Sequence, residues 1–295
     1  MMRSKADQLT EVAPDVYCLG PRGRTQTNVY FFRSGASWFL VDAGWPKDAP
    51  AIERAAGALF DRPPAAILLT HYHPDHAGAA LPLACKWNVP VYLHPLEMPL
   101  AAGNFDALRS GSGPLDRWLI LPILRLFGRR RRDAVLARSS LGGVARALGP
   151  KGAMPGLPEW QWIATPGHTP GHVSFFRERD RVLVSGDALV TLRLNSFWGL
   201  LLQRPGLSGP PWYTTWSTPA AAQSVAALAA LRPAVLLTGH GAPMAGSGTA
   251  AAVEEFARAF ASERAVLAAS GVAAATPAPV SPKAGACDVQ RSADR

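Results

Sequence analysis

The sequence predicts an α/β fold in which helices pack on β-sheets. Short segments rich in β-branched and aromatic residues alternate with segments of helix-favouring composition in each half of the chain. Hydrophobic residues make up 48% of the 295 residues, which is enough for a large buried core. The 27 glycines and 27 prolines indicate many turns and loops, so a helical bundle is not expected.

The predicted elements are short and fall into two halves of the chain. In the first half we expect a helix at residues 49–60 and strands at residues 12–19, 28–32, 37–41, 66–70 and 89–93. In the second half we expect helices at residues 219–231 and 249–268 and strands at residues 160–164, 173–177, 181–185 and 234–238.

These elements are expected to form one domain over residues 1–269. The pattern weakens at about 95–158, a stretch rich in Leu, Arg, Gly and Pro that we interpret as an insertion into this domain. After residue 268 the composition falls to Ala, Pro, Ser and charged residues. Residues 270–295 are therefore predicted to form a disordered tail.

The cysteines and the N-terminus indicate a cellular compartment. The three cysteines are odd in number and no pair has the spacing of metal ligands, so a disulfide framework is not expected. The first twenty residues carry charges and no apolar core, which argues against a secretory signal. The protein is therefore predicted to be cytoplasmic.

The strongest functional signal lies directly after the predicted strand at residues 66–70. Here the sequence Thr-His-Tyr-His-Pro-Asp-His-Ala-Gly places four potential metal ligands within six residues: His71, His73, Asp75 and His76. In a turn from strand to helix, His71 and His73 point to the same side, while Asp75 and His76 project from the start of the helix. Imidazole and carboxylate groups together favour borderline metals such as zinc.

Three more candidate ligands each follow a predicted strand and stand next to a glycine. His168 lies in Thr-Pro-Gly-His, Asp187 in Ser-Gly-Asp and His240 in Thr-Gly-His-Gly. Folds of the α/β type build their sites at the ends of strands, and glycine lets the backbone come close to a crowded centre. We therefore expect these three side chains to join the first four.

This ordered set resembles the metallo-β-lactamase superfamily, whose hallmark is His-x-His-x-Asp-His followed by a spaced His, Asp and His. The resemblance covers about residues 10–250 and implies a four-layer αββα sandwich. It also implies that the two metals share the bridging carboxylate of Asp187. One metal would be held by His71, His73 and His168, and the other by Asp75, His76 and His240.

Two further residues are expected to support the ligands without binding metal. Asp42, in Val-Asp-Ala-Gly, matches an early aspartate of the superfamily that has this role. His172 follows His168 closely, and we interpret it as a packing or supporting residue.

The candidate ligands predict hydrolysis assisted by two divalent metal ions. Such a pair lowers the pKa of a bound water and stabilises a developing oxyanion. Asp75 is the expected catalytic residue, because its carboxylate can orient the hydroxide and carry its proton to the leaving group. Zinc is the expected metal, with iron or manganese as alternatives. The diiron members that reduce oxygen carry Glu at the position of His73, so a redox function is not favoured.

The compact layout is similar to glyoxalase II-like thioesterases and lactonases of the superfamily. This similarity favours a small-molecule substrate with an ester, thioester or lactone bond. A phosphodiester hydrolase is one alternative. The other is a non-catalytic metal-binding scaffold associated with a membrane.

The expected insertion carries most of the net charge of +9, with ten Lys and Arg against four Asp and Glu. Within it, residues 115–132 combine a strongly apolar run at 118–127 with four consecutive arginines at 129–132. This segment could pack on the domain, cover the site as a lid for an acyl substrate, or make peripheral contact with an anionic membrane. Nucleic acid is not an expected partner, because no aromatic stacking platform is interleaved with the arginines.

A second unusual segment, residues 189–216, follows Asp187 and is rich in aromatic residues. These aromatic residues are Phe197, Trp198, Trp212, Tyr213 and Trp216. They could line an apolar acyl pocket or pack loops on the core.

Overall fold

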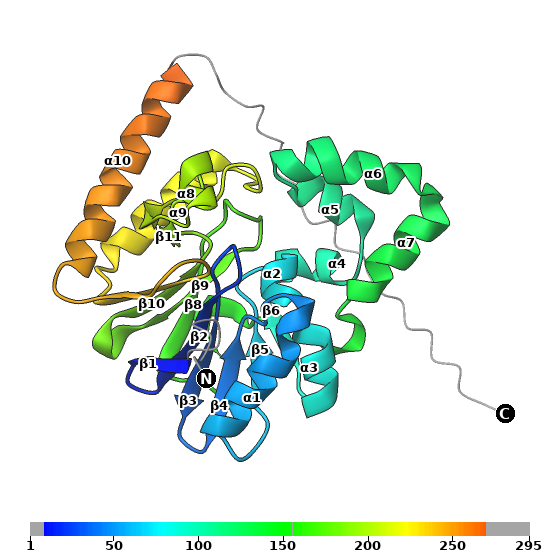
Figure 1. Cartoon of the computed structure of the whole chain (residues 1–295), viewed down its shortest axis with the longest axis horizontal. Helices are drawn as coiled ribbons and strands as arrows, with labels where there is room; N and C mark the ends of the chain where they lie inside the picture. Colours follow the sequence, from blue (N-terminus) through cyan, green and yellow to red (C-terminus); the bar gives the residue numbers. More distant parts are fainter. Residues whose placement is uncertain (1–8, 155, 270–295) are drawn as a thin grey trace.

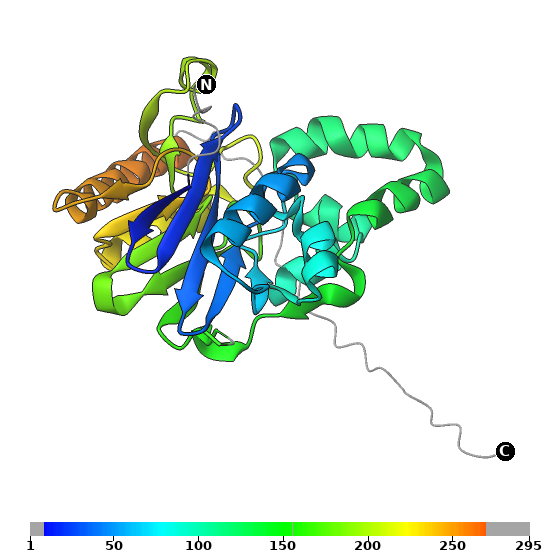
Figure 2. The same cartoon turned by 60° about the horizontal axis from the view of Figure 1, so that its bottom comes forward.

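Two β-sheets lie face to face between two layers of helices (Figures 1 and 2). The computed structural model describes residues 9–154 and 156–269. It confirms the predicted four-layer αββα sandwich. The expected tail at 270–295 lies outside the described residues. None of the helices in the described part of the chain combines the length and the apolar composition needed to span a membrane.

The first sheet has seven strands in sequence order, and their pairing changes from antiparallel to parallel at β4. The strands β1 to β4 are antiparallel neighbours, whereas β4 to β7 run parallel to one another. Their bounds are β1 (Leu9–Ala13), β2 (Val16–Arg22), β3 (Thr27–Ser34), β4 (Ser37–Val41), β5 (Ala66–Leu68), β6 (Val91–Leu93) and β7 (Ala145–Ala147).

The prediction of one strand at residues 12–19 was wrong, because two strands cover this stretch. The chain turns at Pro14 and Asp15, so β1 ends at Ala13 and pairs with β2 as a hairpin. Asp15 adopts a φ of 63°, a left-handed conformation that aspartate tolerates better than most residues. The turn is built around this one residue, and the apolar pattern on either side hides it from sequence inspection.

The second sheet has five strands and is mostly antiparallel. Its spatial order is β14 (Met244–Ala245), β13 (Val235–Thr238), β10 (Val182–Gly186), β9 (Val173–Arg177) and β8 (Trp160–Ala164). Only β10 and β13 run parallel to each other. A separate two-stranded sheet joins β11 (Val190–Leu192) and β12 (Pro205–Ser208).

Central strands of both sheets are buried on both faces, which explains their continuous apolar sequences. In β4, Phe39 and Val41 point between the two sheets, whereas Leu40 points to the outer helices. In β10, Val184 contributes to the core between the sheets and Leu183 to the outer core. The period of two along each strand therefore serves two cores at once.

The outer layers are the helices that the sequence predicted, with one addition. The first sheet is covered by α1 (Ala49–Leu59) and by α3 (Ala80–Trp87), which the sequence analysis did not find. The second sheet is covered by α9 (Thr218–Ala230) and α10 (Thr249–Ala269). Apolar side chains at helical spacing, such as Val225 and Leu228 of α9, fill the outer core.

The chain between β6 and β7 is helical over most of its length. We call residues 95–139 the helical segment; in Figure 1 it projects to one side of the sandwich. It contains η3 (Pro95–Glu97), α4 (Met98–Ala101), α5 (Phe105–Gly111), the π-helical turn η4 (Asp116–Ile120), α6 (Leu121–Leu126) and α7 (Gly128–Ser139). After it, β7 returns to the sheet edge, where the Leu148 amide donates to the Leu93 carbonyl at 2.9 Å.

Candidate metal centre

The histidine-rich motif forms a tight loop between β5 and the short helix α2 (Pro74–Ala77). His73 is the residue before the helix, and Pro74 occupies the first helical position, where its missing amide hydrogen costs nothing. The amide of His76 donates to the His73 carbonyl at 3.0 Å, which closes the turn. As predicted, His71 and His73 face the same side, with His71 Nε2 3.1 Å from His73 Nδ1.

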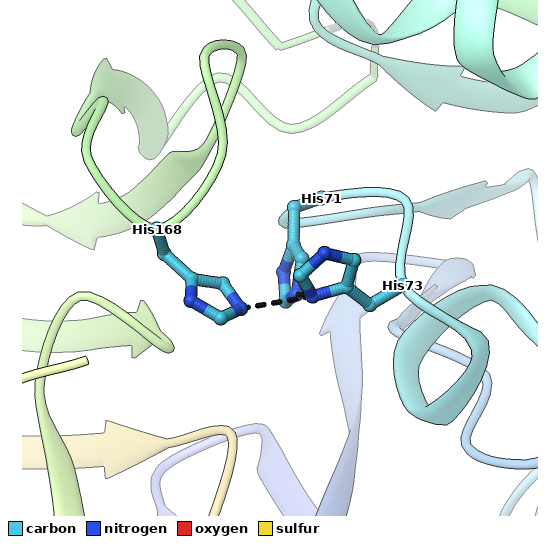
Figure 3. A group of neighbouring side chains, drawn as sticks. All are labelled: His71, His73 and His168. Atoms are coloured by element: carbon cyan, nitrogen blue, oxygen red, sulfur yellow. Dashed lines mark hydrogen bonds between the residues drawn. The ribbon is translucent and has the colours of Figure 1, made fainter. Parts of the chain in front are cut away.

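Three loops from the second sheet bring the other candidate ligands to this turn. His168 follows β8, Asp187 follows β10 and His240 follows β13. Since β10 and β13 are parallel neighbours, their carboxyl ends meet at one edge of the sheet, as the sequence analysis assumed. Figure 3 shows His168 pointing at His71 and His73 from the opposite side, with its Nε2 2.9 Å from His73 Nδ1.

The seven candidate ligands lie in three overlapping groups whose ligand atoms are all within 4.8 Å of one another in each group. The groups are His71, His73 and His168; His71, His76 and Asp187; and Asp75, His76 and His240.

Asp187 lies at the junction of these groups. Its Oδ1 is 3.3 Å from His76 Nε2, and its Oδ2 is 3.4 Å from His168 Nε2 and 3.3 Å from His240 Nε2. Its position is the one that a bridging carboxylate would need. The assignment of these residues as ligands stays a prediction.

The donor atoms fit divalent cations in number, type and spacing. Nitrogens about 2.0–2.1 Å from a tetrahedral zinc ion would be roughly 3.3 Å apart, close to the separations in this cluster. Three buried polar atoms here have no hydrogen-bond partner among the described residues: His76 Nε2, His168 Nδ1 and Asp187 Oδ1. Such unpaired atoms are costly in a protein interior, and a cation would satisfy the two that face the centre, His76 Nε2 and Asp187 Oδ1.

A glycine is required where the second sheet meets the cluster. A Cβ atom at Gly239 would lie 2.2 Å from Asp187 Oδ1 and 2.7 Å from His76 Cε1. Any side chain would therefore displace two candidate ligands. This agrees with the expectation that glycines beside the ligands allow close approach.

Asp42 orients two candidate ligands through one carboxylate. It accepts from His76 Nδ1 at 2.8 Å and from the Thr70 hydroxyl at 2.9 Å. Because that hydroxyl gives its only hydrogen to Asp42, it accepts from His71 Nδ1 at 3.0 Å. Both imidazoles thereby keep Nε2 facing the centre, which is the role that a supporting residue has in metal sites.

His172 lies outside the three groups and contacts the centre through the backbone of Asp187. Its Nε2 accepts the Asp187 amide hydrogen at 3.0 Å, so in the neutral ring Nδ1 carries the hydrogen and donates to Thr165 Oγ1 at 2.8 Å. Burial lowers the pKa of His172 to about 3, which keeps the ring neutral. It holds the Asp187 loop in place, as the sequence analysis suggested.

Glu97, which sequence reasoning missed, ties the two histidine loops together. Its buried carboxylate accepts from the Tyr72 amide at 3.0 Å, the Thr169 hydroxyl at 2.7 Å and the Gly171 amide at 2.9 Å. The first partner lies between His71 and His73, and the other two follow His168. No local motif could have revealed it, because its partners are 25 to 74 residues away in sequence.

Two more titratable groups, Asp116 and Tyr213, border the centre. Asp116, at the start of η4, is partly buried, and burial raises its pKa while the charge of His73 opposes that shift. Burial also raises the pKa of Tyr213, and the nearby carboxylates of Asp187 and Asp75 raise it further. The Tyr213 phenol therefore keeps its hydrogen.

The histidines of the cluster divide into two electrostatic classes. Burial and neighbouring imidazoles hold the pKa of His71 and His168 well below the ordinary value, so both are neutral. Burial also opposes charge on His76 and His240, but the carboxylates around them, Asp187 above all, raise their pKa. Without metal, His76 and His240 therefore hold protons where a cation would bind.

A family model described as the metallo-β-lactamase superfamily matches residues 22–240 of this chain. The probable metallo-hydrolase YflN of Bacillus subtilis is 41% identical over 239 residues, covering 78% of this chain and 86% of that protein. A hydroxyacylglutathione hydrolase of Acidiphilium cryptum is 32% identical over 183 residues, covering 58% of this chain and 56% of that one.

Solved structures of similar proteins have the same architecture. A metallo-β-lactamase family protein of Thermus thermophilus superposes with a TM-score of 0.60 at 25% identity, covering 88% of this chain and 82% of that one. The subclass B3 metallo-β-lactamase MEM-A1, isolated from a soil metagenome library, superposes with a TM-score of 0.57 at 21% identity, covering 90% of this chain and 97% of that one. At that identity, the second likeness concerns the fold alone.

Replacing Asp187 by Asn should weaken metal binding at both expected ion positions at once. Since this carboxylate faces His76, His168 and His240, its loss weakens every cation bound there. We expect metal content to fall from about two ions per chain to below one. Elemental analysis after gel filtration measures this, with the exposed Asp61→Asn as control. Equal metal in both variants would contradict the shared position of Asp187.

Zinc binding to the metal-free protein should release protons at pH 7. His76 and His240 hold protons because their pKa values are raised, and metal must displace them. We expect about one to two protons released, and affinity that falls about tenfold per pH unit for each proton as pH decreases. Calorimetry in two buffers of different ionisation enthalpy measures this. Identical heats in both buffers would rule out the displaced protons, and His94→Gln, outside the cluster, should behave like the parent.

Glu97→Gln should destabilise the protein and weaken metal binding. The amide would point a donor at groups that are themselves donors, so we expect a loss of about 1–3 kcal/mol in unfolding free energy. Urea unfolding measures the stability, and competition with a chelator measures the metal affinity. The control is Glu53→Gln, which breaks an exposed pair with Lys86 and should cost about 0–1 kcal/mol. Equal effects of the two changes would show that Glu97 does not hold the loops.

Proposed function

The chain belongs to the metallo-β-lactamase superfamily, and we propose that it is a hydrolase that uses two divalent metal ions to cleave an ester, thioester or lactone. The superfamily match and the relatives establish a metal-binding hydrolase. One observation carries the finer proposal: His76, His168 and His240 all direct a nitrogen at the single buried carboxylate of Asp187. Two ions sharing Asp187 would use every ligand that this arrangement offers.

The proposed metal is zinc, with iron or manganese as the alternatives to be measured. Five imidazoles and two carboxylates are donors of intermediate softness, which suit zinc better than magnesium or calcium. The first ion would be held by His71, His73 and His168, the second by Asp75, His76 and His240, and both by Asp187.

The bound ions would supply a water of lowered pKa and would polarise the carbonyl oxygen of the substrate. The residues of the chain perform the remaining steps. Asp75 lies at the first turn of α2, with its Oδ2 3.4 Å from His240 Nε2, and its partly exposed carboxylate can accept a proton and pass it to the leaving group. Tyr213 keeps its phenolic hydrogen and can donate it to the oxygen that gains charge.

The relatives support the proposed bond. A hydroxyacylglutathione hydrolase acts on a thioester, and the relative of that name aligns with more than half of this chain. We propose a small-molecule substrate of this bond class. Asp116 and Tyr213 border the centre and would contact the substrate beside the reacting bond.

The proposed function is tested with a substrate panel and a chelator. Metal-loaded protein should hydrolyse one or more of a thioester, a lactone and an aryl ester, with a rate that rises as pH increases through about 7. Dialysis against a chelator should abolish the rate, and zinc or manganese should restore it. Asp75→Asn should lower kcat by about 10²–10⁴-fold. Turnover of a phosphodiester alone would replace the proposed bond class, and buffer-level rates throughout would exclude a hydrolase of these substrates.

A further inference from the structure

The helical segment exposes a set of large apolar side chains on the surface of the described part of the chain. Leu121 and Leu124 of α6 are buried, so one side of this helix packs against other parts of the chain. Trp118 of η4 is 85% exposed and Leu126 of α6 is 84% exposed. Other exposed apolar residues of this stretch are Leu115, Leu119, Ile120, Ile123 and Phe127. Packing on the domain thus explains only part of this sequence.

The aromatic segment after Asp187 adds a second exposed apolar cluster. Phe197 is 74% exposed and Trp198 is 61% exposed, both in α8 (Phe197–Leu201). The adjoining Leu201 and Leu202 are exposed as well, and so is Trp212. Of the two alternatives for these aromatics, packing of loops on the core is wrong for Phe197, Trp198 and Trp212, which are exposed. We call residues 115–127 and α8 together the apolar face.

The helical segment approaches the metal centre at two points. The Leu115 amide donates to the Tyr213 carbonyl at 2.6 Å, which joins the start of η4 to the loop after β12. A Cβ at Gly111 would contact Pro170, beside His168, so the end of α5 lies against the His168 loop. Figures 1 and 2 both draw α6 and α8 in the upper part of the molecule.

A cationic cluster adjoins the apolar face. Arg129, Arg130 and Arg131 are exposed at the start of α7. Arg129 Nε lies 3.9 Å from Asp133 Oδ2, whereas neither Arg130 nor Arg131 has an acidic partner among the described residues. Arg132 does not belong to this cluster, because it is only partly exposed and stacks on Phe105 at 4.1 Å.

A hollow of about 280 Å³ lies beside this cluster and is lined by both guanidinium groups and apolar side chains. It is lined by Phe127, Arg131, Ala134, Val135 and Arg138. Guanidinium groups next to apolar side chains match a phospholipid, whose anionic headgroup lies above its acyl chains.

We propose that the apolar face and Arg129–Arg131 form a docking surface for an anionic lipid bilayer. Tryptophan and phenylalanine enter the boundary between headgroups and acyl chains, while the arginines attract anionic headgroups. Docking through residues 115–127 would bring the Tyr213 loop, which Leu115 contacts, close to the bilayer, so an apolar substrate could reach the metal centre from the lipid.

The charge distribution favours a bilayer over a second copy of the chain. A second copy of the chain offers no opposite charge, because each copy carries the same arginine cluster and a net charge of +9. A bilayer that contains anionic lipid offers the opposite charge at the same place.

The test is sedimentation of the full-length, metal-loaded chain with vesicles. One set contains phosphatidylcholine alone, and the other contains three parts phosphatidylcholine to one part phosphatidylglycerol. The parent should bind the anionic vesicles and not the neutral ones. Arg129→Ser with Arg130→Ser and Arg131→Ser should weaken binding on the order of a hundredfold at low salt, since each arginine contributes roughly fivefold. The control removes three exposed arginines elsewhere, Arg54→Ser with Arg62→Ser and Arg179→Ser, and should retain most of the binding.

The apolar contribution is measured with Trp118→Ser and Leu126→Ser in one variant and Phe197→Ser and Trp198→Ser in another. Both should lose the binding that persists at high salt, where charge attraction is screened. Because these side chains are exposed, melting temperature and zinc content should equal those of the parent.

Three results would overturn the proposal: equal sedimentation of the parent with both vesicle types, full binding by the apolar variants, or a dimer in sedimentation velocity that Trp118→Ser dissociates. Vesicle binding does not depend on turnover, so the outcome is independent of the proposed function.

Discussion

The carboxylate of Asp187 lies 3.3–3.4 Å from nitrogens of His76, His168 and His240, almost entirely shielded from water. A buried negative charge among imidazoles is stable only if positive charge is held between them, as protons or as metal ions. The two sheets meet at this point, because Asp187 and His240 follow strands of one sheet and His76 follows a strand of the other. The proposed centre therefore joins the ends of strands from both sheets.

The residues around the centre act on ligand orientation more than on charge. Asp42 fixes His76 directly and His71 through Thr70, so one carboxylate at the end of β4 sets two rings. Asp42 adopts a φ of 57°, and the strain of a left-handed aspartate is offset by this network. Glu97 orients the two histidine loops, because its carboxylate joins the backbone between His71 and His73 to the segment after His168.

The helical segment relates the centre to its surroundings. Glu97, at its start, supports the loops of the candidate ligands, whereas Asp116 lies near His73 and Trp118 is exposed. Within a few turns, this segment thus contributes a buried residue, a residue near the candidate ligands and an exposed surface residue. A relative that shares the sandwich but differs here would keep the proposed chemistry and alter what reaches it.

The sequence alone determined that helices pack on sheets and which residues are candidate ligands, because strand periodicity, the His-x-His-x-Asp-His motif and the glycine-flanked residues are local signals. The four-layer order was implied by the resemblance to the superfamily. The turn at Asp15, the helix α3 and the edge strand β7 escaped it, since short elements between longer ones carry too little pattern. Only the tertiary structure revealed Glu97 and the proximity of Tyr213, whose partners are distant in sequence. The tertiary structure also showed which residues of the apolar run at 118–127 are buried. Composition cannot tell a buried leucine from an exposed one. Only the packing of the chain buries Leu124 and leaves Leu126 exposed.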